Sequence, residues 1–391
     1  MSWPLRQDGT ALLTGRGSFA KVPGLCADRR VVVVASTGAL QRCLAAEWLP
    51  PGARTFTAFH PNPTVEQAMA AARLCRACGA DLVVGLGGGS TLDVAKAGRV
   101  LPADPGEADQ IIAGRRPAAT VGPELLLVPT TAGTGSEVTS FATLYQGHRK
   151  VSLDTPAARA DIAVVDPTLT ETCSPRLTWS CAFDCLAHAV ESLWSVRSTV
   201  ESRELAAAAL RLLVPVLRHA DELPGPAERD DLSRASTLAG QAIDITRTTA
   251  AHAMSYPLTA HLGIPHGLAC ALNLTWLVPL VETARPEQIV DQRGPAAVRE
   301  AIDTVRSTFN AQHTSLADVL RTTIDQRVAP PYGEVPPSDA ELMDLLVAEG
   351  LSSNRMTGTP VRLERTQARA GLETIFPAVV TARGRGCATT G

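Results

Sequence analysis

The chain has 391 residues, of which 45% are hydrophobic, so it can bury a large core and its length favours two domains. Its 36 basic and 39 acidic residues give a net charge of −3 without a long run of either sign, which argues against nucleic-acid or membrane-surface binding. No apolar stretch approaches the roughly eighteen residues of a transmembrane helix, the N-terminus is polar, and the nine cysteines are scattered. We therefore expect a cytoplasmic globular protein whose partner is neither a nucleic acid nor a membrane.

Strands and helices alternate through the N-terminal part, residues 1–172. Apolar, β-branched runs predict strands at residues 31–36, 81–87, 124–130 and 161–167. Helical composition predicts helices at residues 63–80 and 90–101. The alternation indicates right-handed crossovers between strands. We therefore expect an α/β domain built on a doubly wound, mostly parallel sheet.

The pattern changes after Pro167. Ser174 followed by Pro175 predicts a helix start, because serine caps the first turn and proline is tolerated within it. Helical patterns without strand signals follow at residues 201–220, 231–243 and 294–310, with a proline-rich loop at 328–339 and a frayed tail at 381–391. The sequence thus predicts an all-α domain over residues 173–391.

The stretch "GLGGGSTLDVAK" (85–96) follows a predicted strand and opens a predicted helix. Gly87, Gly88 and Gly89 let the backbone approach a ligand closely, and the N–H groups of a helix start favour an anion such as a pyrophosphate. Ser90 stands where the dinucleotide-binding fingerprint has its third glycine. The motif alone fits an anion site and a plain tight turn equally well, and its place inside the sheet argues against an ordinary Rossmann domain.

A second small-residue loop, "PTTAGTGSEVTS" (129–140), ends another predicted strand. Thr130, Thr131, Thr134 and Ser136 offer hydroxyl and amide groups at the carboxyl end of the sheet, where open α/β sheets bind ligands. A surface loop is the alternative interpretation. Two such loops on successive strands favour a cofactor cleft.

Acidic and histidine residues gather in two later segments. Asp184 and His188 are four residues apart, so they share a helix face and can chelate one metal ion. His252, His261 and His266 lie within fifteen residues of one another. The neighbouring pair Cys181 and Cys185 and the CxxC at 75–78 have no second thiolate pair, and we interpret all four cysteines as core residues.

The chain resembles the iron-dependent, group III alcohol dehydrogenases over most of its length. The matching motifs, in kept order and spacing, are "HPNPTVEQA" (60–68), "GGGSTLDVAK" (87–96), "PTTAGTGSEVT" (129–139), "VVDPTLT" (164–170), "AFDCLAHAVES" (182–192) and "HAMSYPLTAHLGIPHG" (252–267). The resemblance implies the dehydroquinate synthase-like fold of that family, with a dinucleotide-binding domain, a helical domain and a divalent metal in the cleft between them. It also implies a homodimer.

The resemblance also assigns site residues. The implied metal ligands, for Fe²⁺ or Zn²⁺, are Asp184, His188, His252 and His266. The implied NADH or NADPH site has Gly87, Gly88, Gly89 and Ser90 at the pyrophosphate and Thr130, Thr131 and Ser136 beside the nicotinamide. We add Thr134, Asp93 and Lys150, which lie in or beside the same motifs. His261 falls outside the pattern. In this reading the metal polarises a carbonyl that accepts hydride from the reduced nicotinamide.

Two positions depart from the family pattern. Family members often have a histidine four residues after the third metal ligand, where this chain has Tyr256, a phenol that could still relay a proton. Members that exclude NADP often carry an acidic residue after the first strand. Ser36 stands there, so repulsion of a 2′-phosphate is absent and NADPH is acceptable.

The segment "DITRTTAAHAMSY" (244–256) predicts a helix that carries Thr248, His252 and Tyr256 on one face toward the metal. Arg247, flanked by hydroxyls, would then bind an anionic group of the substrate. The alternative is an arginine on the solvent face, with the neighbouring threonines capping the helix or hydrogen-bonding back to its backbone. With "GTGSEVTSFATLY" and "HRKVSL", this segment resembles the phosphonoacetaldehyde reductases within the group.

The leading hypothesis is therefore an NAD(P)H-linked reductase of a small, anionic aldehyde, with phosphonoacetaldehyde reduced to 2-hydroxyethylphosphonate. A general short-chain alcohol or 4-hydroxybutyrate-type dehydrogenase is the runner-up. A metal-dependent lyase on the same scaffold would use a glutamate and two histidines as ligands, whereas this chain offers an aspartate and three histidines. A non-catalytic relative would have lost a metal ligand, and none is lost.

Overall fold

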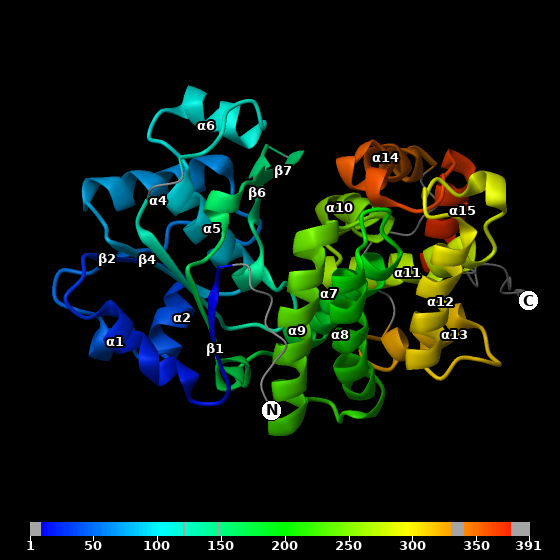
Figure 1. Cartoon of the computed structure of the whole chain (residues 1–391), viewed down its shortest axis with the longest axis horizontal. Helices are drawn as coiled ribbons and strands as arrows, with labels where there is room; N and C mark the ends of the chain where they lie inside the picture. Colours follow the sequence, from blue (N-terminus) through cyan, green and yellow to red (C-terminus); the bar gives the residue numbers. More distant parts are fainter. Residues whose placement is uncertain (1–8, 120–121, 148, 330–339, 377–391) are drawn as a thin grey trace, which may run out of the picture.

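The computed structural model describes residues 9–119, 122–147, 149–329 and 340–376, and it has two lobes side by side (Figure 1). The first, the α/β lobe, is built around a six-stranded parallel sheet with the strand order β1-β8-β5-β4-β2-β3. Its strands are β1 (Ala11–Thr14), β2 (Val31–Ala35), β3 (Arg54–Phe56), β4 (Leu82–Gly87), β5 (Glu124–Pro129) and β8 (Ile162–Val165). The predicted doubly wound parallel sheet is confirmed.

Burial on both faces explains why the central strands are readable in the sequence. Every residue of β2 and β4 is buried, because helices lie on both sides of the sheet. The helices of this lobe are α1 (Val22–Cys26), α2 (Thr37–Arg42), α3 (Ala45–Trp48), α4 (Val65–Ala77), α5 (Gly89–Val100) and α6 (Pro105–Ile112). The predicted helices at 63–80 and 90–101 correspond to α4 and α5.

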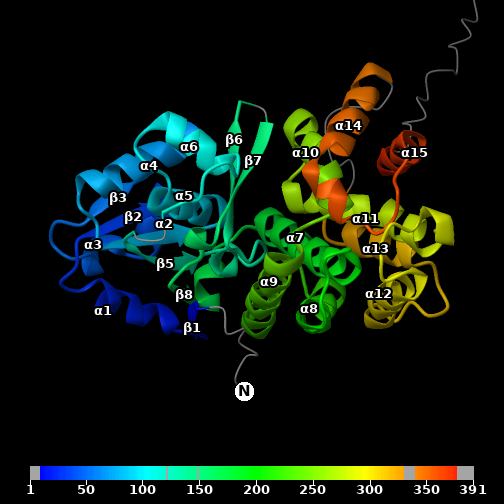
Figure 2. The same cartoon turned by 45° about the horizontal axis from the view of Figure 1, so that its top comes forward.

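An antiparallel hairpin outside the main sheet was not predicted. Its strands are β6 (Phe141–Gln146) and β7 (Arg149–Asp154). Buried and partly buried positions alternate along β6, and β7 has a single buried residue, so neither strand forms a continuous buried apolar run. The hairpin stands on the side of the α/β lobe that faces α10 and α14 (Figures 1 and 2). Side chains from both of its strands, among them Phe141 and Lys150, line the cleft that is described below.

The second lobe is helical. Ser174 caps its first helix by accepting a hydrogen bond from the N–H of Leu177, as the sequence predicts. Its helices are α7 (Pro175–Trp194), α8 (Val200–His219), α9 (Pro226–Thr246), α10 (Ala250–Leu262), α11 (His266–Glu282), α12 (Pro295–Thr308), α13 (Leu316–Asp325), α14 (Ala340–Ser352) and α15 (Arg365–Ile375), with short 3₁₀ turns that include η6 (Asn354–Gly358). The predicted domain boundary at 172 falls in the connection between β8 and α7. Most of the predicted loop at 328–339 and all of the predicted tail at 381–391 lie outside the described residues.

The loop after β5 joins the two lobes by close backbone contact. Gly135 has φ 60°, and a Cβ atom there would lie 2.4 Å from the Cα of Gly240 in α9. A Cβ atom on Gly133 would lie 2.4 Å from the carbonyl oxygen of Cys181 in α7. Only glycine permits these approaches. The small-residue loop is therefore packed between lobes and is not a free surface loop.

The predicted single helix over 244–256 is wrong. α9 ends at Thr246, Arg247 has φ 59°, and α10 begins at Ala250. The buried carboxylate of Glu191 accepts hydrogen bonds from the N–H groups of Thr249 and Ala251, at 2.9 and 2.8 Å. This carboxylate caps a new helix start and so divides the segment in two.

No helix in the described part of the chain is both long and apolar enough to span a membrane.

Candidate active site

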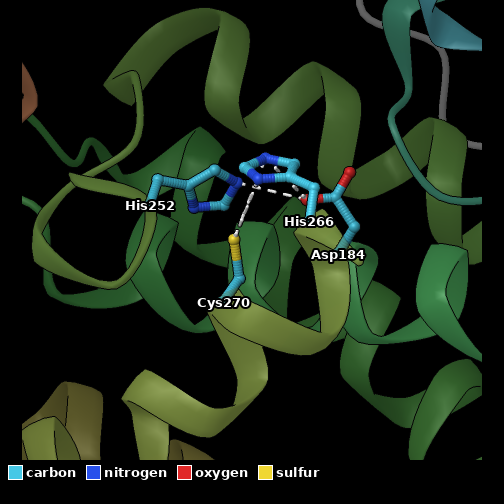
Figure 3. A group of neighbouring side chains, drawn as sticks. All are labelled: Asp184, His252, His266 and Cys270. Carbon is cyan, nitrogen blue, oxygen red and sulfur yellow. Dashed lines mark hydrogen bonds and ion pairs between the residues drawn. The ribbon is translucent and has the colours of Figure 1, made fainter. Parts of the chain in front are cut away.

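The four predicted metal ligands converge between α7, α10 and α11. The Nε2 atom of His252 lies 3.2 Å from Oδ1 of Asp184. The Nε2 atoms of His188 and His266 lie 3.5 and 3.8 Å from the same oxygen. Figure 3 shows Asp184, His252 and His266 pointing toward one another. The structure thus brings together all four residues of the implied ligand set.

The electrostatics of three of these residues suit a divalent metal. Burial lowers the pKa of His188 to about 4 and that of His266 to about 3, so both imidazoles are neutral and can ligate at neutral pH. Burial alone would raise the pKa of Asp184, but its neighbours His188 and His252 hold it well below its ordinary value. The exception is His252: burial alone would lower its pKa, but its neighbours Cys270 and Glu191 raise it well above its ordinary value, so this imidazole must lose a proton before it ligates. One carboxylate and three imidazoles form a donor set that accepts Fe²⁺ or Zn²⁺.

Outer contacts orient two of the imidazoles. Nδ1 of His252 is paired with the fully buried carboxylate of Glu191, and Nδ1 of His266 lies 3.2 Å from the hydroxyl of Ser255. These contacts leave each Nε2 atom directed at Asp184, the arrangement by which proteins fix the tautomer of a metal-bound histidine. Glu191 was not predicted as a site residue from the sequence, although it lies in the same helix as Asp184.

Cys270 is a further donor that the sequence analysis missed. One donor atom each from Asp184, His252, His266 and Cys270 lies within 4.8 Å of the others (Figure 3). Burial raises the pKa of this thiol, so it is protonated at neutral pH. Its spacing of four residues from His266 was the signal available in the sequence. Cys181 and Cys185 carry no such donor geometry, and their pKa values are also raised by burial.

The two glycine-containing loops meet at the start of α5. Gly88 is the N-cap residue of this helix, and a Cβ atom on Gly89 would lie 2.7 Å from Cγ2 of Thr134. A Cβ atom on Gly88 would lie 3.3 Å from Oγ1 of Thr131. Small residues are therefore required here, at a helix start whose first N–H groups have no partner within the helix.

A buried lysine joins these loops. Lys96 is fully buried and donates hydrogen bonds to the hydroxyls of Ser136 and Thr139, at 2.9 and 2.8 Å. Ser136 in turn donates to Asp93 at 2.7 Å. Burial lowers the pKa of Lys96 to about 8. Asp93 and Ser136 therefore belong to a network that holds α5 against the second loop.

A cleft with an empty volume of about 820 Å³, open mouth included, is lined both by residues of these loops and by the four predicted metal ligands. The predicted site residues that line it are Gly89, Ser90, Asp93, Thr134, Ser136, Lys150, Asp184, His188, Thr248, His252, Tyr256 and His266. Those that do not are Gly87, Gly88, Thr130, Thr131, Arg247 and Ser36. Ser36 is exposed and caps α2 after strand β2.

The cleft wall beside the metal ligands carries a phenol and two cations. The ring of Tyr256 stacks on His266 with centroids 5.9 Å apart, and the Lys150 ammonium lies 3.8 Å from the Tyr256 centroid. Arg355, from η6, lines the same cleft. Burial alone would raise the pKa of Tyr256, but Lys150 and the other nearby cations lower it. The phenol is thus more acidic than an ordinary tyrosine.

Arg247 does not reach this cleft. Its guanidinium donates to both carboxylate oxygens of Asp154, at 2.8 and 2.9 Å, and lies 3.5 Å from a carboxylate oxygen of Asp244. The break between α9 and α10 removes the helical geometry on which its predicted substrate contact rested. Arg247 therefore joins α9 to the hairpin. His261 lies apart from the ligands and pairs with Glu349 at 2.9 Å.

The chain matches two family models. Residues 9–167 match the model described as iron-containing alcohol dehydrogenase. Residues 178–323 match the C-terminal model of the Fe-containing alcohol dehydrogenase family.

Curated relatives include reductases of small aldehydes. The phosphonoacetaldehyde reductase of Streptomyces viridochromogenes is 35% identical over 322 residues, which are 78% of this chain and 79% of the relative. The sulfoacetaldehyde reductase of Bilophila wadsworthia is 33% identical over 54% of this chain and 56% of the relative.

Solved structures share the fold over nearly the whole chain. The iron-containing alcohol dehydrogenase of Thermotoga maritima has a TM-score of 0.77 and 27% identity, with 96% of this chain and 99% of that chain covered. The sulfoacetaldehyde reductase of Bifidobacterium kashiwanohense, solved in complex with NAD⁺, has a TM-score of 0.78 at 24% identity, with the same shares covered. At that identity the second likeness establishes the fold alone.

Proposed function

The chain belongs to the iron-containing alcohol dehydrogenase family and is an oxidoreductase of this family, and from this premise we propose that it reduces a small anionic aldehyde to the primary alcohol. The substrate we propose is phosphonoacetaldehyde, reduced with NADH or NADPH to 2-hydroxyethylphosphonate for phosphonate natural-product biosynthesis. The observation that carries the proposal is the convergence of Asp184, His188, His252 and His266 on one point of the cleft that the two loops enter.

These four residues would hold Fe²⁺ or Zn²⁺ in the cleft. When bound, the metal would supply a Lewis acid for the aldehyde carbonyl, and NADH or NADPH would supply the hydride. The start of α5, at Gly88 and Gly89, would hold the pyrophosphate through its free N–H groups. Thr134 and Ser136 line the same cleft as Gly89 and the proposed metal ligands, and they would line the nicotinamide.

Reduction of an aldehyde also requires a proton on the new alcohol oxygen. Tyr256 is the group we assign to this transfer, because it lines the cleft, stacks on His266 and has its pKa lowered by nearby cations. Lys150, over the face of the Tyr256 ring, would keep the phenol acidic. Thr248 also lines the cleft and offers a second hydroxyl group.

An anionic substrate is supported by the charges of the cleft and by the relatives. Lys150 and Arg355 both line it, and the relatives named above act on a phosphonate-bearing and a sulfonate-bearing aldehyde. We therefore expect an anionic two-carbon aldehyde to be preferred over an uncharged one of similar size.

The test is a comparison of aldehydes with the metal-loaded enzyme. Rates with phosphonoacetaldehyde, succinic semialdehyde and propanal are followed by NAD(P)H absorbance, and metal content is measured on the same samples. We expect the highest kcat/KM with phosphonoacetaldehyde and about one metal ion for each chain. A higher kcat/KM with propanal or succinic semialdehyde would overturn the proposed substrate.

A further inference from the structure

Two arginines lie against the same aromatic ring, and only one of them faces the cleft. The guanidinium carbons of Arg247 and Arg355 lie 4.8 and 5.7 Å from the centroid of Phe141. Phe141 and Arg355 line the cleft, whereas Arg247 does not. The two residues are therefore chemically matched, but they differ in access to a bound substrate.

The charge of Arg247 is already neutralised. Asp154 accepts two hydrogen bonds from it, and Asp244 lies beside the same guanidinium. Among the described residues, neither Arg355 nor Lys150 has a carboxylate within ion-pair distance. The side-chain partner of Arg355 is a neutral hydroxyl, that of Ser152, at 3.2 Å. Half-buried cations without a carboxylate partner favour an anion from solution.

We propose that Arg355 binds the anionic end of the substrate, with Lys150 on the opposite side of that group, while the aldehyde end lies at Asp184 and the histidines. The inference rests on the proposed function and names the residue that selects the substrate class. A guanidinium forms paired, parallel hydrogen bonds to two oxygens of a phosphonate or sulfonate group. An alkyl or hydroxyalkyl end cannot accept them, so Arg355 discriminates between anionic and uncharged aldehydes.

The position of Arg355 in the fold explains how it can bind the anionic end of the substrate. It lies in η6, between α14 and α15, and so enters the cleft from the helical lobe. Lys150 enters from the hairpin strand β7 of the α/β lobe. An anion between these two cations would be held from both lobes at once, and Tyr256 lies under Lys150 on the side toward the metal ligands.

The experiment compares Arg355→Met with Arg247→Met, a control that removes the same charge beside the same ring. The first readout is the ratio of kcat/KM for phosphonoacetaldehyde to kcat/KM for propanal, which cancels a general loss of folded or metal-loaded enzyme. The second is the inhibition constant of ethylphosphonate, an anion without an aldehyde, against propanal reduction. For Arg355→Met we expect the ratio to fall and the inhibition constant to rise by about ten- to a hundred-fold, the effect of losing a charge-assisted hydrogen bond. Arg247→Met should keep both at wild-type values.

Two results distinguish failure of the role of Arg355 from failure of the proposed function. If wild type prefers phosphonoacetaldehyde and is inhibited by ethylphosphonate, but Arg355→Met retains both properties, the role of Arg355 is overturned and the proposed function stands. If wild type neither prefers phosphonoacetaldehyde nor is inhibited by ethylphosphonate, the proposed substrate and the role of Arg355 both fail. Arg355→Lys tests whether the charge alone is sufficient or the shape of the guanidinium is also needed. This variant should have a higher ratio of kcat/KM values than Arg355→Met but a lower one than wild type, because an ammonium binds the anion through fewer fixed hydrogen bonds.

Discussion

Gly267 sets the distance between α7 and α11, the two helices that carry three of the four proposed metal ligands. It follows His266 at the start of α11, where it packs against α7. A Cβ atom on Gly267 would lie 1.9 Å from the carbonyl oxygen of Ser180, 2.7 Å from the N atom of Asp184 and 2.9 Å from its Cβ atom. Replacement of Gly267 by alanine would therefore act directly on the backbone that presents Asp184.

The size of the effect follows from these distances. A Cβ atom needs at least 3.0 Å to a neighbouring heavy atom, so α7 and α11 would have to separate by 3.0 − 1.9 = 1.1 Å or more. The clash is with backbone and cannot be relieved by a side-chain rotation. Metal–ligand bonds tolerate only about 0.2 Å, so a separation of this size would break the ligand set. Overpacking also costs roughly 1–3 kcal/mol of unfolding free energy.

Gly267→Ala is therefore expected to lower metal affinity by more than about ten-fold and kcat/KM by about a hundred-fold. Metal content after dialysis and aldehyde-dependent NAD(P)H oxidation measure the two effects. Gly98→Ala is the matched control, because it is also a helical glycine but its Cβ atom would meet Ala71 at an ordinary 3.4 Å. Wild-type metal content and turnover in Gly267→Ala would refute the reasoning.

Three further outcomes are expected. His266→Ala should abolish metal binding and turnover but leave NADH binding, followed by fluorescence, because the nucleotide loops belong to the other lobe; full metal occupancy would contradict its assignment as a ligand. Ser36→Asp should shift preference from NADPH toward NADH, since a carboxylate repels the 2′-phosphate, and an unchanged ratio of kcat/KM for the two cofactors would mean that Ser36 is remote from the ribose. Burial lowers the pKa of Lys96 from 10.5 to about 8. The free energy of unfolding of the wild type should therefore increase relative to that of Lys96→Met as the pH rises from about 8 to 10.5. In that window the folded protein has lost a proton that the unfolded chain still holds, so a penalty of roughly 3 kcal/mol is relieved. Thermal midpoints of both proteins at pH 7, 9 and 10.5 test this, and a constant difference between them would disprove it.

The sequence alone identified the elements whose signal is local. Buried parallel strands such as β2 and β4 appear as continuous apolar runs, because both of their faces are covered. The pair of Asp184 and His188 is readable because a helix fixes which residues share a face. Residue chemistry and motif order then sufficed to propose a metal and a dinucleotide, since few side chains can serve either role.

The tertiary structure decided what depends on residues distant in the chain. A carboxylate at Glu191 caps the start of α10 and interrupts a segment whose composition is helical throughout, so the predicted contact of Arg247 with substrate was lost. Arg355 reaches the cleft only because η6 folds back beside the hairpin, and no periodicity near it signals this. The spacing of apolar residues in a helix shows which face of that helix is apolar. Whether a charge on that element is neutralised by a partner or left open to a ligand depends on packing between lobes, which local sequence does not encode.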